Sequence, residues 1–494
     1  MKAVLHETDL VCYTKRNEQT KQIELVEESV VSDRMPDIGL LGGTNANVVL
    51  RVKKAEDGVG ILVGDLIATV CYIPDGSESF QSVEVTIPWE AEFESENITA
   101  QTILIGDVSI GNVDVRMMNP RKVQVKLQLN VRLLAFEKEN LILHHDMDEN
   151  TAIQVRKEIK DYSVISAVTE KTFAVSDEWP LSEEYYGGSI LSKSVQLRVD
   201  DVKTIANKLI VKGSVLSDVV ISTDKRAGDR ISFTSSFSFI AETESETVTA
   251  DVVTALLPTG VFYEISADGR AITMEVHGVC QMMCYEKREL AYISDSYSNF
   301  YKCELQYRPL SIFTENKNVL HRENVVTTVN GRSQLAKVVF TNAQIHSVVK
   351  KDSTSQIPVT LGACVLYENG TNDWLKKSFT VDVKQSENEY ITAVRIGDIY
   401  AVVNGTELEV RMSLDIESRK EVNAMLNCVS EIVYDETSSY CMLRPSISVV
   451  RYTGELWELA KNYGSTVELI QLYNQLEDNI LEEERMLLIP KQSL

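Results

Sequence analysis

Short motifs recur along this chain at a spacing of roughly 145–150 residues, so the chain is built from repeated units. Residues 32–36 (SDRMP) return as residues 176–180 (SDEWP), and a Leu-Arg-Val tripeptide follows each of them. Residues 119–121 (NPR) correspond in the same way to residues 268–270 (DGR). A third, weaker copy is indicated by Asn404-Gly405, which has the place of these Asn-Pro and Asp-Gly turns.

Alternating apolar residues follow each of the three turns. The clearest run is Val123, Val125, Leu127, Leu129 and Val131, with polar residues between its members. Apolar residues two apart, bounded by turn-forming pairs, are typical of half-buried strands joined in hairpins. The sequence therefore predicts a mainly β protein with three tandem antiparallel β-sandwich or barrel-like domains, at residues 20–150, 165–295 and 315–435. A smaller domain at 446–491 completes the chain.

Helical periodicity is scarce before residue 455. Residues 152–166 are expected to form a short helix after the first block. Residues 145–150, 294–299 and 435–445 are polar and aperiodic, which indicates linkers.

The chain has 494 residues and a formal charge of -24, with 73 acidic and 49 basic residues. This charge opposes binding to nucleic acid and anionic lipid, and it favours a partner with a basic face. The chain contains no stretch of 18 apolar residues, so no membrane span is predicted. Residues 1–13 lack the uninterrupted apolar region of a signal peptide. The eight scattered cysteines agree with a reducing compartment, so a cytoplasmic protein is expected.

No group of residues suggests catalysis, a metal site or a cofactor. Cys280 and Cys284, with Cys303 downstream, distantly resemble a zinc site. However, they share the parity of Ile272 and Met274, which predicts that both thiols point into the core. The pair His144-His145 is expected in a solvated loop with no nucleophile near it.

The pattern changes from period two to helical at residue 446. Ile447 and Val449 belong to a short strand, residues 456–463 form a helix that ends at Gly464, and Ser465 or Thr466 caps a second helix. Residues 486–490 (MLLIP) return as a strand. The predicted order is βααβ.

This order, with the strings LWELAKNYGSTVELIQLYN and MLLIP, resembles the LysM family. The resemblance implies a groove that binds N-acetylglucosamine-containing glycans, between the loop after the first strand and the loop before the last. It places Leu456, Leu459, Ala460, Tyr463, Leu469 and Leu472 in the core. With Trp457 and Asn474, these positions form the expected core and partner surface. The groove loops correspond to Thr453, Gly454, Glu455, Ile480, Leu481, Glu483 and Glu484.

The chain departs from the LysM pattern at the groove. Glu455 replaces the hydroxyl residue of the usual Gly-Asp-Thr/Ser motif, and Glu483-Glu484 replaces the usual Pro-Gly. These carboxylates put charge on the rim of a groove that normally has small residues. Protein binding is therefore favoured over sugar binding, with a basic partner surface complementing the acidic rim.

Repeated β blocks with one C-terminal LysM module resemble the SipL and SpoVID type of spore-coat morphogenetic proteins, whose β blocks are called SPOCS domains. The strongest resemblance lies in residues 176–290, where residues 209–215 (LIVKGSV) are expected as a central strand and 231–239 (ISFTSSFSF) as another. The resemblance implies a non-enzymatic scaffold in the mother cell, at the forespore surface, that binds the coat ATPase SpoIVA through its tail and contacts other coat proteins. Two alternatives stay open: a module that binds peptidoglycan or its precursor, and a self-assembling structural subunit.

Overall fold

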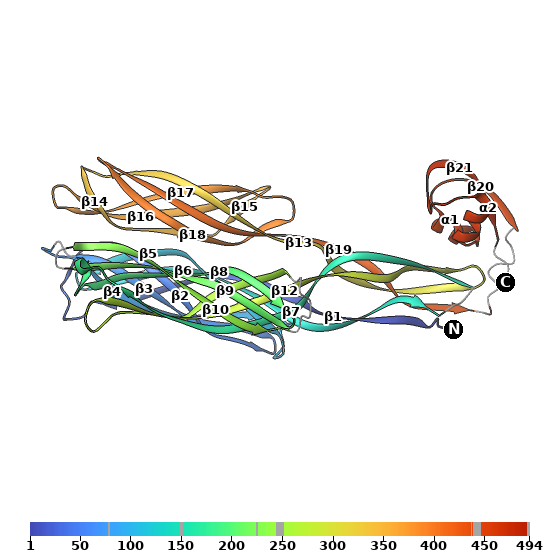
Figure 1. The fold of residues 1–494 in the computed structure, drawn as a ribbon, viewed down its shortest axis with the longest axis horizontal. Coiled ribbons are helices and arrows are strands. Elements are labelled where there is room, and N and C mark those ends of the chain that lie inside the picture. Colours follow the sequence, from blue (N-terminus) through green and yellow to red (C-terminus); the bar gives the residue numbers. More distant parts are fainter. Residues whose placement is uncertain are drawn as a thin grey trace.

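The structure is a computed structural model that describes residues 1–77, 80–148, 152–223, 226–243, 251–435, 437 and 446–491, apart from the side chains of 226, 227, 315, 316 and 340. It confirms the expected fold class, because the chain is mainly antiparallel β-structure with two short α-helices near its C-terminus. Figure 1 shows an elongated molecule with a broad body, a narrower arm and a small domain beside the end of the arm. Both termini lie at the arm's end of the molecule (Figure 1).

The elements follow one plan three times. The first block contains β1 (Leu5–Val30), β2 (Ile38–Glu56), β3 (Val59–Pro74), β4 (Gln81–Glu94), β5 (Ile103–Asn119) and β6 (Lys122–Met147). The second contains β7 (Ile153–Pro180), the 3-10 turn η1 (Glu183–Tyr185), β8 (Ser189–Ile205), β9 (Lys208–Thr223), β10 (Arg226–Glu242), β11 (Asp251–Ile265) and β12 (Ala271–Ser298). The third contains β13 (Lys302–Asn330), β14 (Leu335–Ile345), β15 (Val349–Lys351), β16 (Thr354–Tyr367), β17 (Asn372–Lys384), β18 (Glu389–Asn404) and β19 (Glu407–Asp435). The C-terminal domain contains β20 (Ile447–Glu455), α1 (Leu456–Tyr463), α2 (Val467–Asn474) and β21 (Ile480–Pro490).

Each block is a sandwich of two layers. Its first strand pairs with its last strand, which also pairs with the strand before it, giving β1-β6-β5, β7-β12-β11 and β13-β19-β18. The other layer is a small sheet with the order β2-β3-β4, β8-β9-β10 or β14-β16-β17, and β15 adds to β16. The segments at 209–215 and 231–239 lie in β9 and β10, and β9 is central as expected.

The alternating run of β6 fills the first sandwich. Val125, Leu127 and Leu129 are buried against Leu62 and Leu66 of the small sheet, while the polar residues between them face outward. Full burial of one such aliphatic side chain contributes about 1.5–3 kcal/mol. The alternation thus sets the register, because a slip of one residue would expose the whole apolar face.

A glycine in the central strand of each small sheet marks the repeat. Gly64, Gly213 and Gly362 are spaced 149 residues apart, and a Cβ at each would approach an aromatic ring of the neighbouring strand to 2.6 Å or less. At Gly213 the added atom would also lie 2.4 Å from the carbonyl oxygen of Arg198. These rings pack directly on backbone, which only glycine permits.

The first and last strands of each block form a long hairpin, β1–β6, β7–β12 or β13–β19. The halves of these hairpins that extend beyond the small sheets form the arm. Equivalent residues of all six strands share one apolar cluster: Leu10, Cys12, Leu143, Tyr162, Val164, Leu290, Tyr292, Leu310, Ile312, Leu426 and Cys428. Within the described ranges, the long strands of different blocks pair only at Tyr13↔Ile165 and Phe313↔Ser163, and Lys2, ahead of β1, forms an isolated bridge with Val433 of β19. Elsewhere along the arm, side-chain packing holds the hairpins together.

The arm accounts for the errors in the predicted helix and linkers. Residues 153–166, expected as a helix, belong to β7 and pair with β12 from Ile153↔Ser298 to Ile165↔Tyr285. This long-range ladder buries Tyr162 and Val164 and outweighs local helical preference. Parts of two expected linkers are strand for the same reason, since residues 145–147 belong to β6 and residues 294–298 to β12. Most of the third, at 435–445, lies outside the described residues.

Candidate functional site

The C-terminal domain has the expected order of strand, two helices and strand. Gly464 ends α1 in the left-handed region at φ 69°, and the Thr466 hydroxyl accepts a hydrogen bond from the backbone N–H of Leu469 at the start of α2. These two features confirm the predicted helix end and one of the two predicted caps.

The core expected for this domain is partly wrong. Leu456, Leu459 and Ala460 are buried as predicted, whereas Leu469 is half-buried. Tyr463 is 36% exposed and Leu472 is 71% exposed.

The fully buried residue of α2 is instead Ile470. The helix is anchored by its cap at Thr466, which turns Ile470 inward and leaves Leu472 about 200° away on the solvent side. The amide of Asn474 is structural, because it donates to the carbonyl oxygens of Ile470 and Leu488 and accepts from the N–H of Leu488.

The two expected groove loops are joined to each other. Gly454 pairs with Leu481 and Glu455 with Ile480, so β20 and β21 extend through both segments. The Thr453 hydroxyl also donates to the carbonyl oxygen of Leu481 at 3.0 Å. Glu483 and Glu484 are exposed on β21. The two segments are therefore paired at Gly454 and Glu455, and a bulge at Thr453 and residues 482–484 interrupts the ladder between this pairing and the rest of the sheet.

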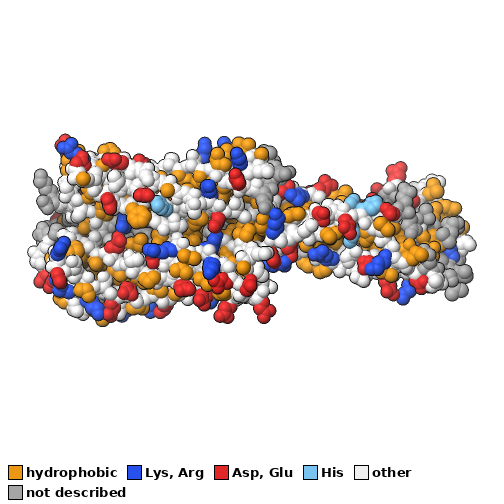
Figure 2. Space-filling model, turned by 90° about the horizontal axis from the view of Figure 1, so that it is seen from below, with side chains coloured by type: hydrophobic (Ala, Val, Ile, Leu, Met, Phe, Trp, Pro, Cys, Tyr) orange, Lys and Arg blue, Asp and Glu red, His pale blue; other side chains and the backbone are white. Residues whose placement is uncertain are grey.

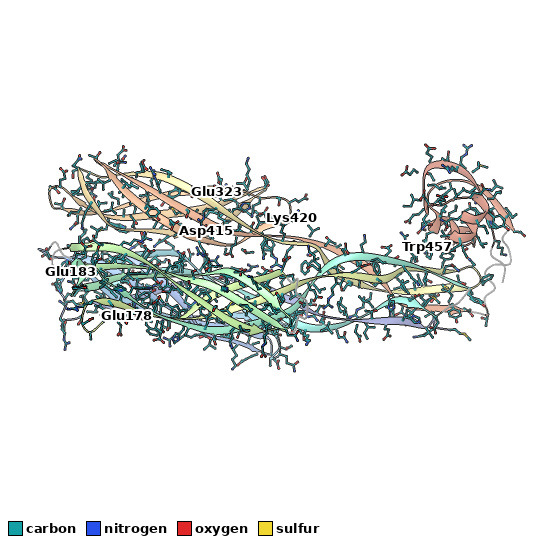
Figure 3. The ribbon with its side chains drawn as sticks, viewed as in Figure 1. Glu178, Glu183, Glu323, Asp415, Lys420 and Trp457 are labelled. Carbon is teal, nitrogen blue, oxygen red and sulfur yellow. The ribbon has the colours of Figure 1, made fainter. Side chains whose placement is uncertain are left out.

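One side of the domain rests on the hairpin of the second block. Trp457 faces the arm (Figure 3), and its Nε1 donates to Asp295 Oδ2 at 2.8 Å. Lys461 Nζ lies 2.6 Å from the same oxygen. Burial raises the pKa of Asp295, but hydrogen bonds from Lys461 and Trp457 outweigh it and lower the pKa below its usual range.

Two further contacts complete this docking surface. Arg156 makes a bidentate pair with Glu455, at 2.9 and 2.7 Å. Tyr297 is buried within the core cluster of the C-terminal domain, where its ring meets Trp457 edge to face at 4.8 Å, and its hydroxyl donates to the carbonyl oxygen of Ser465. Bidentate pairing fixes orientation as well as contributing energy, so the domain has a defined position on the arm.

The sequence analysis missed the arm side of this contact. Asp295 and Tyr297 lie in a segment expected to be a linker, and Arg156 lies in the expected helix. A comparison of the repeats gives a weak indication of the contact at Tyr297, because this residue corresponds to Asp148 in the first block at the spacing of 149 residues. An aromatic residue at a polar position of the repeat indicates an added contact.

The outer face of the β20–β21 sheet stays exposed. Val449 lies directly opposite Leu488 in the ladder, and their side chains are 59% and 44% exposed. Ile447 and Met486 extend this apolar face along the same side of the sheet. Residues 477–484 (EDNILEEE), leading into and along β21, supply an acidic border. We call Ile447, Val449, Met486 and Leu488 the outer patch.

The remaining candidates of the sequence analysis lie elsewhere. Cys280 and Cys284 are fully buried, as predicted, and burial raises the pKa of the Cys280 thiol to about 12. His144 and His145 lie in strand β6 rather than in a loop, because His144, Asp146 and Met147 pair with β1 and His145 is a bulge between them. No grouping of histidine, cysteine and acidic side chains suited to a metal ion occurs among the described residues. Both α-helices of the described chain are too short to cross a membrane.

Comparison of the chain with protein-family models, with curated proteins and with solved structures finds no match.

Proposed function

We propose that this protein is a non-enzymatic scaffold that grips a protein partner through its LysM-like C-terminal domain, while its three β blocks contact other components of an assembly. The observation that carries the proposal is the outer patch. It remains exposed although the opposite side of the same small domain is docked on the arm. An exposed apolar face on a domain held in a fixed position is typical of an interaction site.

The chemistry of the outer patch indicates the kind of partner. Its apolar side chains are bordered by the acidic segment 477–484, and the whole chain carries a charge of -24. A partner with an apolar centre and a basic border is complementary to this surface. On the face that Figure 2 draws, acidic and basic side chains are interspersed over the body and the arm, without one large basic field. This distribution favours a protein partner over nucleic acid.

The resemblance to the SipL and SpoVID type suggests where this happens. We place the protein in the mother cell of an endospore former, at the forespore surface, with a SpoIVA-like coat ATPase as the partner of the tail and other coat proteins as partners of the SPOCS-like blocks. Three blocks in one chain favour avidity, since one docked contact raises the effective concentration for the next.

Sugar binding is less favoured. Gly454 and Glu455 pair with Leu481 and Ile480, and the Glu455 carboxylate is engaged by Arg156. A glycan would have to separate these strands before it reached the backbone groups between them.

The test is deletion of residues 446–494 in sporulating cells, followed by co-purification and localisation with the coat ATPase. We expect both to be lost. A Val26→Lys variant, changed at an exposed apolar position of β1, serves as the control for a surface change outside the C-terminal domain. Unchanged association of the truncated chain would refute the tail as the anchor.

A further inference from the structure

A small cavity lies where the three blocks meet, at the base of the arm. Its volume is about 110 Å³, and its lining comes from β1, β5 and β6 of the first block, β7, β11 and β12 of the second, and β13, β18 and β19 of the third. Lys420, next to the lining residue Arg419, marks this part of β19 in Figure 3. The cavity lies beside the Tyr13↔Ile165 and Phe313↔Ser163 bridges that join the hairpins.

A buried guanidinium group lines this cavity without its full set of partners. Arg419 is 4% exposed, and its Cζ lies 4.0 Å from the ring centroid of Tyr285. Its Nε is 2.6 Å from a Glu421 oxygen, at an angle unsuited to a hydrogen bond. Among the described residues, neither Nε nor Nη2 has a hydrogen-bond acceptor. Buried donors of a charged group are costly to leave unpaired, which indicates an occupant.

Among the described basic side chains of the lining, Arg419 is the one that keeps unpaired donors. Lys15 and Arg132 both pair with Glu18, and Arg395 pairs with Glu417. An anion in the cavity would therefore be bound through Arg419. Burial raises the pKa of Asp107, although Arg395 and Arg132 oppose this shift.

The rest of the wall is apolar and comes from all three blocks, including Ile105, Phe136, Met283 and Phe313. Water can pair with the charged side chains of the lining, but it leaves this apolar part of the wall without contacts. Inorganic phosphate would leave the wall uncovered. A small organic acid suits both the Arg419 guanidinium and the apolar wall. Its carboxylate can pair with the guanidinium in a planar, bidentate manner while its tail covers the wall.

The geometry points to a binding site for a short-chain monocarboxylate at the junction of the three blocks, with Arg419 as its anion ligand. Such a ligand would join the three hairpins at the base of the arm, because its carboxylate meets β19 while its tail contacts the first and second blocks. This site is independent of the outer patch and of any partner bound there.

Calorimetric titration of the full chain with hexanoate tests this inference, with hexan-1-ol and inorganic phosphate as parallel probes. We expect saturable binding of hexanoate and weaker or no binding of the alcohol, which lacks the charge, and of phosphate, which lacks the tail. Arg419→Met should weaken hexanoate binding about tenfold or more, whereas Arg322→Met, at an exposed arginine paired with Asp415 on the same hairpin, should not.

A second variant covers the event that Arg419→Met does not fold. Ala255→Leu places a larger side chain in the cavity lining and keeps the arginine, and it should also abolish binding. The inference is overturned if wild type shows no saturable hexanoate binding, if the alcohol or phosphate binds as tightly, or if Ala255→Leu binds hexanoate as wild type does.

Discussion

Removal of the charge of Asp295 should loosen the docking of the C-terminal domain on the arm. Its carboxylate accepts from Trp457 Nε1 and pairs with Lys461 Nζ, and its side chain is 15% exposed. Asp295→Asn keeps the shape and an acceptor for the indole but removes the charge. Hydrogen bonds to charged groups contribute about 1.5–3 kcal/mol. Because Lys461 is one-third exposed, the lower part of this range applies, about 1.5–2 kcal/mol.

This loss raises the ratio of undocked to docked C-terminal domain about 10–30-fold. The assay is thiol labelling under native conditions, with Asn299→Cys as the probe in every variant. Asn299 is buried and its amide donates to the carbonyl oxygen of Ser465, so a thiol at this position reacts when the domain leaves the arm. The labelling rate should rise in Asp295→Asn by the same 10–30-fold factor, read by mass spectrometry of the labelled peptide.

The matched control is Asp146→Asn. Asp146 is the equivalent residue of the first block: it pairs with Lys157 at 2.6 Å and accepts from the N–H of the next residue, as Asp295 does. Its ion pair and hydrogen bond lie within the arm, and no described residue of the C-terminal domain takes part in them, so this variant should leave the labelling rate unchanged. Equal labelling rates in Asp295→Asn and in the Asn299→Cys background would refute the docking described above.

Three other outcomes are expected. Gly213→Ala should lower the free energy of unfolding by roughly 1–3 kcal/mol in chemical denaturation, because a Cβ has no room beneath the neighbouring ring; Gly58→Ala, at an open turn with positive φ, measures backbone strain alone. Glu389 is buried, which raises its pKa, but hydrogen bonds from Ser418 and Ser386 outweigh burial and lower the pKa to about 2. The ionised Glu389 stabilises the fold fully at pH values above the pKa of this residue in the unfolded chain, and the stabilisation is lost as the pH falls toward 2. The difference in free energy of unfolding between wild type and Glu389→Gln should therefore shrink by about 2 kcal/mol between pH 6 and pH 3. Burial raises the pKa of the Cys280 and Cys364 thiols to about 12, so both should stay unlabelled at pH 8 until the chain unfolds; rapid labelling of either in the native state would contradict its burial.

Local patterns predicted the strands of the sandwiches well. The run from Val123 to Val131 shows its period of two directly, and Asn404-Gly405 forms the turn between β18 and β19 with Gly405 at φ 68°. The glycine spacing of 149 residues would have strengthened the evidence for the third repeat, whose apolar motifs have diverged. These signals are local or periodic, so they can be recognised in the sequence without knowledge of the tertiary structure.

The arm and the docking surface could not be predicted in this way. Residues 153–166 are ambiguous by themselves, and only the partner strand more than a hundred residues away makes them β. Asp295 is one acidic residue among 73, and its role depends on Trp457, which is 162 residues distant in the sequence. Leu472 fits the core pattern of the resembling family, but the cap at Thr466 sets a helix phase that turns it outward.

The most direct test of the scaffold proposal is calorimetric titration of the purified full chain with a purified SpoIVA-type coat ATPase and, separately, with an N-acetylglucosamine oligomer. Val449→Lys places a positive charge at the centre of the outer patch, and Val26→Lys makes the same change on β1 at similar exposure. We predict saturable binding of the ATPase to wild type and to Val26→Lys, loss of at least tenfold in affinity for Val449→Lys, and no binding of the oligomer. Saturable binding of the oligomer without binding of the ATPase would contradict the proposal.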